Sequence, residues 1–276
     1  MSRTEIVSRG KSAFVDGFEL FDVKLLNDIM LRVAMGGGGD KTPLLMVHGH
    51  PHTHVIWRKV APALAKDRQV ILVDLRGYGD STKPESTPDH RPYSKREMAR
   101  DLQLLLQSLA VKQCDFVGHD RGGRVGHRFA LDWPELVRKA VFIDIAPTAT
   151  MYERTDKEFA SRYFWWFFLI QPEPFPEKLI NFDPEYFLRH HIKGQLKIEG
   201  PLKKMFSKNI CAATVIRKRF TPSARTTVPP QRLILLTTKL MRTNALKRLC
   251  ICSGARAARS ASSMTLCRRG AIRRLL

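Results

Sequence analysis

The sequence predicts an α/β domain built on a mainly parallel sheet, and three observations carry that prediction. Apolar runs of strand length alternate with amphipathic helical runs between about residues 44 and 143. Glycine-containing loops follow several of these apolar runs, at the edge where parallel sheets bind ligands. A length of 276 residues suffices for one such domain with a small insertion.

The strands are expected at regular intervals along the first half of the chain. Residues 18–34 alternate between polar and apolar side chains and predict two strands, which a glycine-rich turn at 36–40 closes. Continuously apolar runs predict the buried strands of a parallel sheet. Three of these runs are residues 44–47, 69–75 and 139–143, and a fourth ends directly before Asp120.

Helices are expected between the buried strands. A short amphipathic helix follows Trp57 and reaches about Lys66, and another covers 122–132. Ser94 and Glu97 form a capping box, which indicates the start of a helix with one apolar face. The resulting β-α-β-α-β alternation predicts crossover helices and a single ligand-binding edge.

The stretch from Phe116 to Arg124 is typical of a nucleophile elbow. Gly118 and Gly122 supply the small residues that a tight strand-to-helix turn needs on either side of its nucleophile. Asp120 stands at the nucleophile position, and a carboxylate that attacks carbon leaves an ester on the enzyme. This motif indicates displacement at saturated carbon or epoxide opening. An ordinary glycine-rich turn with an exposed aspartate is the alternative interpretation of these residues.

The positive charge of the chain lies at its C-terminal end. The formal net charge is +21, yet residues 1–200 hold 29 Lys and Arg against 26 Asp and Glu, whereas residues 201–276 hold 18 against none. This tail also contains no Trp, Tyr or His. Because it offers so few rings to stack on bases, we expect no nucleic-acid partner despite the charge.

Several classes of protein are disfavoured by the composition. The first residues lack an apolar core of signal-peptide length, and the longest apolar run, residues 163–170, is too short to span a bilayer. We therefore expect a soluble, cytoplasmic protein with no membrane partner. The five cysteines show no zinc-site spacing, and the histidines lack a helical pair with a supporting carboxylate, so we expect no metal and no cofactor.

Five segments together resemble the α/β-hydrolase fold and, within it, the haloacetate (fluoroacetate) dehalogenase family: HGHPHTHVIW, VILVDLRGYGDS, VGHDRGGRVGH, VFIDIAPT and YFWWFFLIQPEPFPEKLI. The resemblance covers about residues 10–200. It implies an α/β-hydrolase core at 1–147 and a partial helical cap at 148–204, followed by a basic tail at 205–276. The implied reaction is hydrolysis of a short haloacid, haloacetate to glycolate and halide, through an aspartyl ester. A homodimer is an open alternative to a monomer.

The resemblance assigns the polar site residues. Asp120 is the implied nucleophile, and Asp144 occupies the position of the triad acid. Arg121 and Arg124 are implied to hold the substrate carboxylate, a task that suits planar guanidinium groups. Cations at a helix N-terminus oppose its dipole, which independently favours an anionic ligand. The backbone N–H groups of His50 and Arg121 are the implied oxyanion hole.

The resemblance also assigns two tryptophans to halide binding. Trp166 matches the family's halide-binding tryptophan. Trp165 stands where the fluoroacetate enzymes carry a histidine that also donates to the halide. This departure favours chloroacetate over fluoroacetate as the substrate.

The second half of the reaction lacks its expected base. The family uses a histidine near the C-terminus to activate water, but the last histidine here is His191. We hypothesise that residues from about 205 onward are read in a shifted frame. Residues 208–224 can be coded so that the shifted frame gives KHLRCYRDPETIHAIC, which resembles the family's continuation. Resequencing the coding DNA tests this, and a genuine basic tail is the alternative.

Three functions therefore stay open at this point. The first is a haloacid dehalogenase by descent, whose last sheet strands and catalytic-histidine region are missing and whose ester we expect to persist. The second is an epoxide hydrolase, which shares the Asp nucleophile and uses cap tyrosines such as those available at Tyr152, Tyr163 and Tyr186. The third is a catalytically inactive frameshift product.

Overall fold

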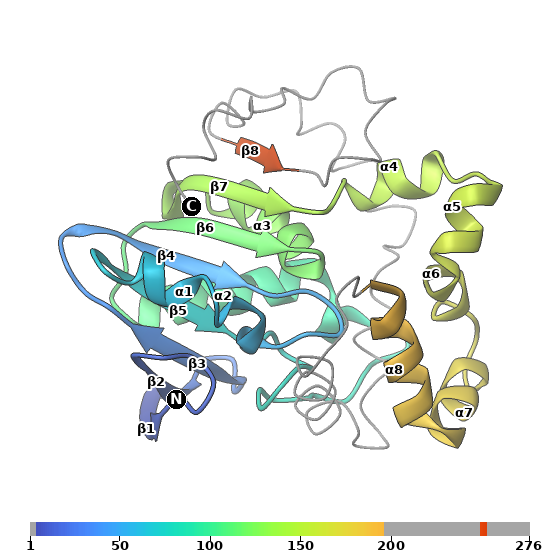
Figure 1. Ribbon diagram of the computed structural model, residues 1–276, viewed down its shortest axis with the longest axis horizontal. Coiled ribbons are helices and arrows are strands. Elements are labelled where there is room, and N and C mark those ends of the chain that lie inside the picture. Colours follow the sequence, from blue (N-terminus) through green and yellow to red (C-terminus); the bar gives the residue numbers. More distant parts are fainter. Residues whose placement is uncertain (1–3, 196–248, 253–276) are drawn as a thin grey trace.

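The computed structural model describes residues 4–195 and 249–252, which form one mixed sheet, its crossover helices and a helical cap (Figure 1). Within these residues the sheet has eight strands in the order β1-β2-β3-β5-β4-β6-β7-β8. The strands are β1 (Glu5–Lys11), β2 (Phe18–Lys24), β3 (Met30–Gly36), β4 (Lys41–Val47), β5 (Arg68–Val73), β6 (Cys114–His119), β7 (Val137–Ile143) and β8 (Leu249–Cys252).

The sheet is parallel where the sequence predicts it to be. Strands β5, β4, β6, β7 and β8 run parallel to one another, whereas β1, β2 and β3 form an antiparallel meander whose last strand, β3, pairs antiparallel with β5. Strand β1 was not predicted, because most of its residues are exposed and give no apolar alternation.

Each buried strand contributes side chains to both faces of the sheet. Leu45 and Val47 of β4 belong to one apolar cluster, and Leu44 and Met46 of the same strand belong to the other. A strand covered on both faces needs an unbroken apolar run, which is the pattern that the sequence shows there.

The core helices are α1 (Ala61–Leu64), α2 (Lys95–Ser108) and α3 (Arg121–Asp132). The capping box is confirmed in part, because the Ser94 hydroxyl accepts a hydrogen bond from the backbone N–H of Glu97 at 3.2 Å. The helix expected from Trp57 to Lys66 is shorter than predicted. Only the single turn α1 falls within that range, and a 3₁₀ turn at His54–Trp57 lies before it. A helix that ran on from Trp57 would need a backbone N–H at Pro62, which has none.

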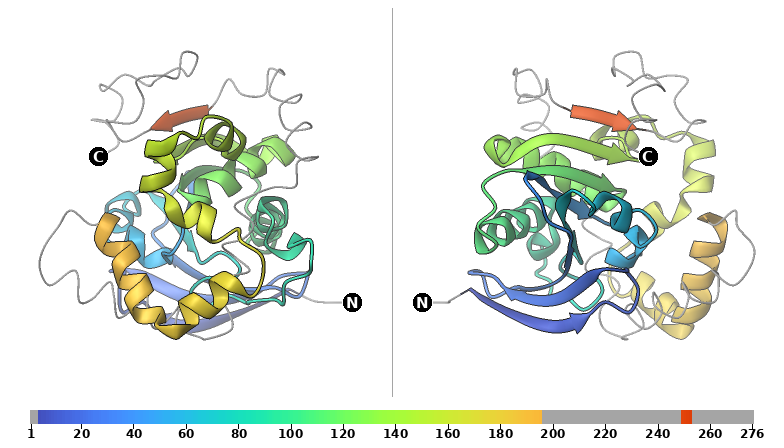
Figure 2. Two further views of the ribbon diagram at one scale, coloured as in Figure 1. Left: turned by 90° about the vertical axis from the view of Figure 1, so that its right-hand side faces the viewer. Right: turned by 60° about the vertical axis from the view of Figure 1, so that its left-hand side comes forward.

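The cap follows β7 and contains α4 (Thr148–Glu153), α5 (Lys157–Arg162), α6 (Phe164–Phe168), α7 (Phe175–Phe182) and α8 (Pro184–Gln195). Figure 1 and the turned views of Figure 2 place these helices beyond the carboxyl ends of β4, β6 and β7. The cap therefore lies on the edge of the sheet where the nucleophile elbow was expected.

The far edge of the sheet differs from the expectation by one strand. The last strands of the sheet were expected to be missing, but β8 pairs in parallel with β7 from Ala140↔Leu249 to Ile143↔Cys252. The run Leu-Cys-Ile-Cys is apolar and of strand length, a local signal that the overall charge of the tail hides. The other predictions for 205–276, including the shifted frame, lie outside the described residues.

Candidate active site

Asp120 occupies a strained turn between β6 and α3. Its φ is 49°, in the left-handed region that residues with a side chain rarely adopt, and it is followed directly by the first residue of α3. A Cβ on Gly122 would lie 2.3 Å from the carbonyl oxygen of Val47, and one on Gly118 would lie 2.6 Å from that of Gly122. The two glycines are therefore required by close backbone approach, as a nucleophile elbow demands.

The Asp120 carboxylate is held by two backbone amides and one guanidinium. The His50 N–H donates to Oδ1 at 2.9 Å, Arg124 Nη1 donates to Oδ2 at 2.9 Å, and the Arg121 N–H also donates to the carboxylate. Burial raises the pKa of Asp120, but the charge of Arg124, the neighbouring His119 and the two amides outweigh burial and lower it. Asp120 is thus ionised at neutral pH, the form in which it can attack carbon.

The loop after β4 is fixed by two buried histidines. His48 Nε2 accepts from the Leu75 N–H at 3.1 Å, which leaves Nδ1 to donate to the Gly49 carbonyl at 2.8 Å. His54 lies 2.9 Å from Asp74, whose charge outweighs the effect of burial and raises the pKa of His54. These contacts hold the His50 N–H in place, so its predicted oxyanion role is geometrically available.

Arg121 and Arg124 both lie buried at the start of α3, as the resemblance implied. The Arg124 guanidinium is 4.7 Å from the ring centroid of Trp166, and that of Arg121 is 5.9 Å from the ring centroid of Tyr78. Only 8% of Arg124 is exposed, and its Nε has no hydrogen-bond partner among the described residues.

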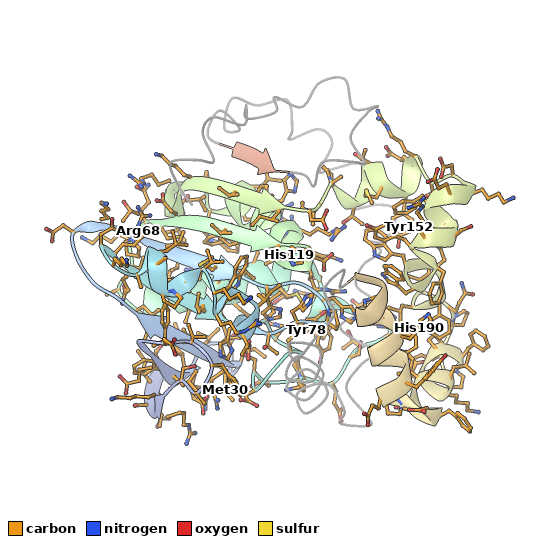
Figure 3. All side chains as sticks on the ribbon, in the orientation of Figure 1. Met30, Arg68, Tyr78, His119, Tyr152 and His190 are labelled. Carbon is orange, nitrogen blue, oxygen red and sulfur yellow. The ribbon has the colours of Figure 1, made fainter. Side chains whose placement is uncertain are left out.

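The two tryptophans of the cap occupy different surroundings. Trp166 is buried against Arg124 and lies 5.4 Å from the ring of Tyr152. Trp165 packs edge-on at 4.7 Å against His191 of α8, whose ring is in turn 5.7 Å from His50. Figure 3 shows His119 and Tyr78 at the edge of the sheet that faces the cap, and Tyr152 and His190 in the cap.

Asp144 lies at the end of β7, on the same edge of the sheet as the elbow. Its φ is 54° and its side chain is exposed. The backbone N–H of Asp120 donates to the carbonyl of Ile143 at 3.2 Å, which ties the two chain segments together. The role of Asp144 as triad acid stays a prediction.

Sequence reasoning missed two residues that the fold brings to this site. The charges that act on Lys95, the first residue of α2, are those of Arg121, Arg124 and Asp120. The resemblance assigned the arginines, and their place at a helix N-terminus independently favoured an anionic ligand; the same placement could have pointed to Lys95. His191 gives no comparable signal, because its place depends on how α8 folds back over the core.

His191 is buried as a neutral imidazole, and this predicts acid sensitivity. Burial lowers its pKa from 6.5 to about 4, so the unfolded chain binds a proton between those values that the folded chain does not. The free energy of unfolding should therefore fall by about 3 kcal/mol as pH drops from about 6.5 to about 4. Urea unfolding across this range measures the slope.

Matched variants isolate the contribution of His191 to that slope. His52 acts in the same direction, since burial and the neighbouring His119 lower its pKa to about 3. His54 acts oppositely, because its raised pKa gives stability that is lost as pH rises above its ordinary value. His191→Phe should flatten the slope, whereas His190→Gln, exposed on the same helix, should leave it unchanged. An unchanged slope in His191→Phe would contradict the assignment.

Within the described residues, no group of three or more His, Cys, Asp or Glu side chains is arranged to hold a metal ion. Of the helices in that part of the chain, none has the length and apolar character to cross a membrane.

The chain belongs to the α/β-hydrolase fold family. The family model described as alpha/beta hydrolase fold matches residues 42–178. A crystal structure of a presumed acyltransferase from Salmonella enterica is 50% identical, with a TM-score of 0.82, over 90% of this chain and 82% of that one.

The relatives also confirm the resemblance to the haloacetate dehalogenases. The chain is 45% identical over 172 residues to a fluoroacetate dehalogenase from a Burkholderia species, and this aligned region covers 62% of this chain and 56% of that protein. It is 37% identical over 123 residues to the soluble epoxide hydrolase of a Corynebacterium species, 45% of this chain and 41% of that one. The chain thus spans about half the length of these curated relatives.

Proposed function

We propose that this hydrolase dehalogenates short haloacids through an ester on Asp120, converting a haloacetate to glycolate and halide. The observation that carries the proposal is the ionised Asp120 carboxylate held at the elbow beside the buried Arg124. A carboxylate can attack saturated carbon directly. The guanidinium of Arg124 can also bind a second anion, the carboxylate of the substrate.

The first step forms the ester. An oxygen of Asp120 attacks the α-carbon of the haloacid while the carbon–halogen bond breaks, and the halide leaves with the electron pair. Trp166 lies against Arg124. The indole N–H of Trp166 is the proposed donor to the departing halide. Trp165 is proposed to join it from the neighbouring position of α6.

The second step needs water. The oxygen of a water attacks Cγ of the Asp120 ester as a base removes a proton from it, and the His50 and Arg121 N–H groups stabilise the oxyanion. The bond from Cγ to the ester oxygen then breaks, that oxygen takes a proton to give glycolate, and the Asp120 carboxylate is restored. A base must accept the proton of that water. Asp144 is proposed to orient such a base, but no histidine follows His191 in the sequence, so we expect the ester to persist in this chain.

An epoxide hydrolase is the second candidate, and Tyr152 is the observation that favours it. Its hydroxyl is buried without a hydrogen-bond partner among the described residues, and burial raises the pKa of Tyr152 to about 12. A phenol that keeps its proton at neutral pH is suited to donate it to an epoxide oxygen. The Corynebacterium relative is an epoxide hydrolase by name.

A pair of reagents separates the two candidates. Chloroacetate should add one carboxymethyl group to the chain, whereas styrene oxide should add none, as judged by intact mass. Tyr152→Phe should leave the chloroacetate reaction within about twofold, because a phenol has no part in it, and Tyr186→Phe on the exposed face of α8 serves as the control. Covalent addition of styrene oxide that Tyr152→Phe slows at least tenfold would replace the dehalogenase proposal with an epoxide hydrolase.

A further inference from the structure

We propose that Lys95 is a substrate-binding residue that joins Arg121 and Arg124 in one anion-binding site and selects haloacids over neutral alkylating substrates. The inference rests on the proposed function, since it names a further residue for the carboxylate of the same substrate. The side chains that support it lie on two consecutive helices, α2 and α3.

The three basic side chains come from the N-terminal ends of α2 and α3. Lys95 is the first residue of α2, Arg121 is the first residue of α3, and Arg124 follows about one turn later. The N-terminal ends of both helices carry partial positive charge, so Lys95 and Arg121 sit where their helices disfavour a further positive charge. Such a cluster is stable only if a negative charge compensates it.

The compensation available within the described residues is incomplete. Asp120 is the one carboxylate among the charges that act on Lys95, and it is already bonded to Arg124 and two backbone amides. This carboxylate is therefore already engaged, and a second anion beside Lys95 would find an amine with no other carboxylate acting on it among the described residues.

Two buried donors of the cluster lack an acceptor. Lys95 Nζ and Arg124 Nε are both shielded from solvent, and neither has a hydrogen-bond partner among the described residues. A buried donor without a partner costs stability, and a cationic one costs more. Burial and then the charges of Arg121 and Arg124 lower the pKa of Lys95 well below its usual range, as expected for an amine held without its counter-ion.

A carboxylate fits these donors best. It has two oxygens that accept charge-assisted hydrogen bonds from several donors at once, and its negative charge favours the protonated form of Lys95. The elbow places this site beside the attacking oxygens of Asp120, so an acid bound there presents its α-carbon to the nucleophile. A neutral epoxide or amide brings no negative charge to Lys95 and so gains less from it, which makes this residue a determinant of substrate class.

The rate at which chloroacetate alkylates the full chain, followed by intact mass, tests the proposal, with chloroacetamide as a neutral reagent of similar size. Lys95→Met should slow chloroacetate about 10- to 100-fold, the range for one charge-assisted hydrogen bond, and leave chloroacetamide within about twofold. Lys112→Met removes the same charge from an exposed position in the loop between α2 and β6 and should change neither rate. Equal rates for Lys95→Met and wild type with chloroacetate, or equal loss with both reagents, would overturn the assignment.

A second measurement keeps this proposal separate from the dehalogenase proposal. Acetate, an unreactive carboxylate, should raise the melting temperature of the wild-type chain at constant ionic strength, and Lys95→Met should lose that shift while melting no lower than wild type without acetate. If acetate stabilises only through Lys95 and chloroacetate still fails to alkylate the chain, the anion site stands and the dehalogenase proposal fails. If acetate stabilises both proteins equally, Lys95 has no part in anion binding.

Discussion

Asp120→Asn is expected to abolish covalent modification by chloroacetate and the halide release that accompanies it. A neutral amide lacks the charge that attacks carbon, and loss of a covalent nucleophile removes at least about 10³-fold in rate. The wild-type chain should release close to one equivalent of chloride and then stop, because its ester is expected to persist. Chloride release and intact mass, measured on the same samples, record both results.

The control for this prediction lies on the same helix. Asp132 is the last residue of α3 and pairs with Arg128 there, away from the elbow. Chloroacetate should therefore alkylate the Asp132→Asn variant at the rate of the wild-type chain. If chloroacetate modified the Asp120→Asn variant to the same extent as the wild-type chain, another group would be the nucleophile. Chloride release over many turnovers by the wild-type chain would show that a base for ester hydrolysis is present after all.

Gly122→Ala should prevent stable folding. The added methyl group would lie 2.3 Å from the carbonyl oxygen of Val47 and 2.4 Å from that of His48, and both are backbone atoms of the central strand and its loop. Neither can move without displacing β4 or α3, so we expect a loss of at least about 4 kcal/mol in the free energy of unfolding. Thermal melts and the yield of folded protein measure this effect.

Gly38→Ala is the matched control for that variant. A Cβ at Gly38 meets nothing within 4 Å, and its φ is outside the left-handed region. The same substitution should therefore be neutral or stabilise the chain by up to about 1 kcal/mol, through the unfolded state. Equal stability of the two variants would contradict the close packing of the elbow against β4.

The sheet and the elbow were predictable because their signals are local. The unbroken apolar run of β4 requires burial on both faces, and the glycines around Asp120 mark a turn that tolerates no side chain. Strand β1 was missed because its exposed residues carry no period. Strand β8 was missed because four apolar residues are a weak signal inside a tail dominated by positive charge.

The site was predictable only in part, because half of it depends on chain segments that meet in space. Asp120, Arg121 and Arg124 follow from one motif, and the structure brings them together with the His50 N–H. The contact between Trp165 and His191 joins two cap helices and has no counterpart in sequence spacing. Lys95 lies 25 residues before the nucleophile in the sequence, and the packing of α2 beside α3 is what places it near Asp120.

The most direct test of the account is to map the modified residue after treatment of the full chain with chloroacetate. Proteolysis followed by tandem mass spectrometry should place one carboxymethyl ester on Asp120, and brief alkaline treatment should remove it and restore the free carboxylate. A carboxymethyl group found instead on a cysteine, histidine or lysine, with Asp120 unmodified, would contradict the claim that this carboxylate is the nucleophile.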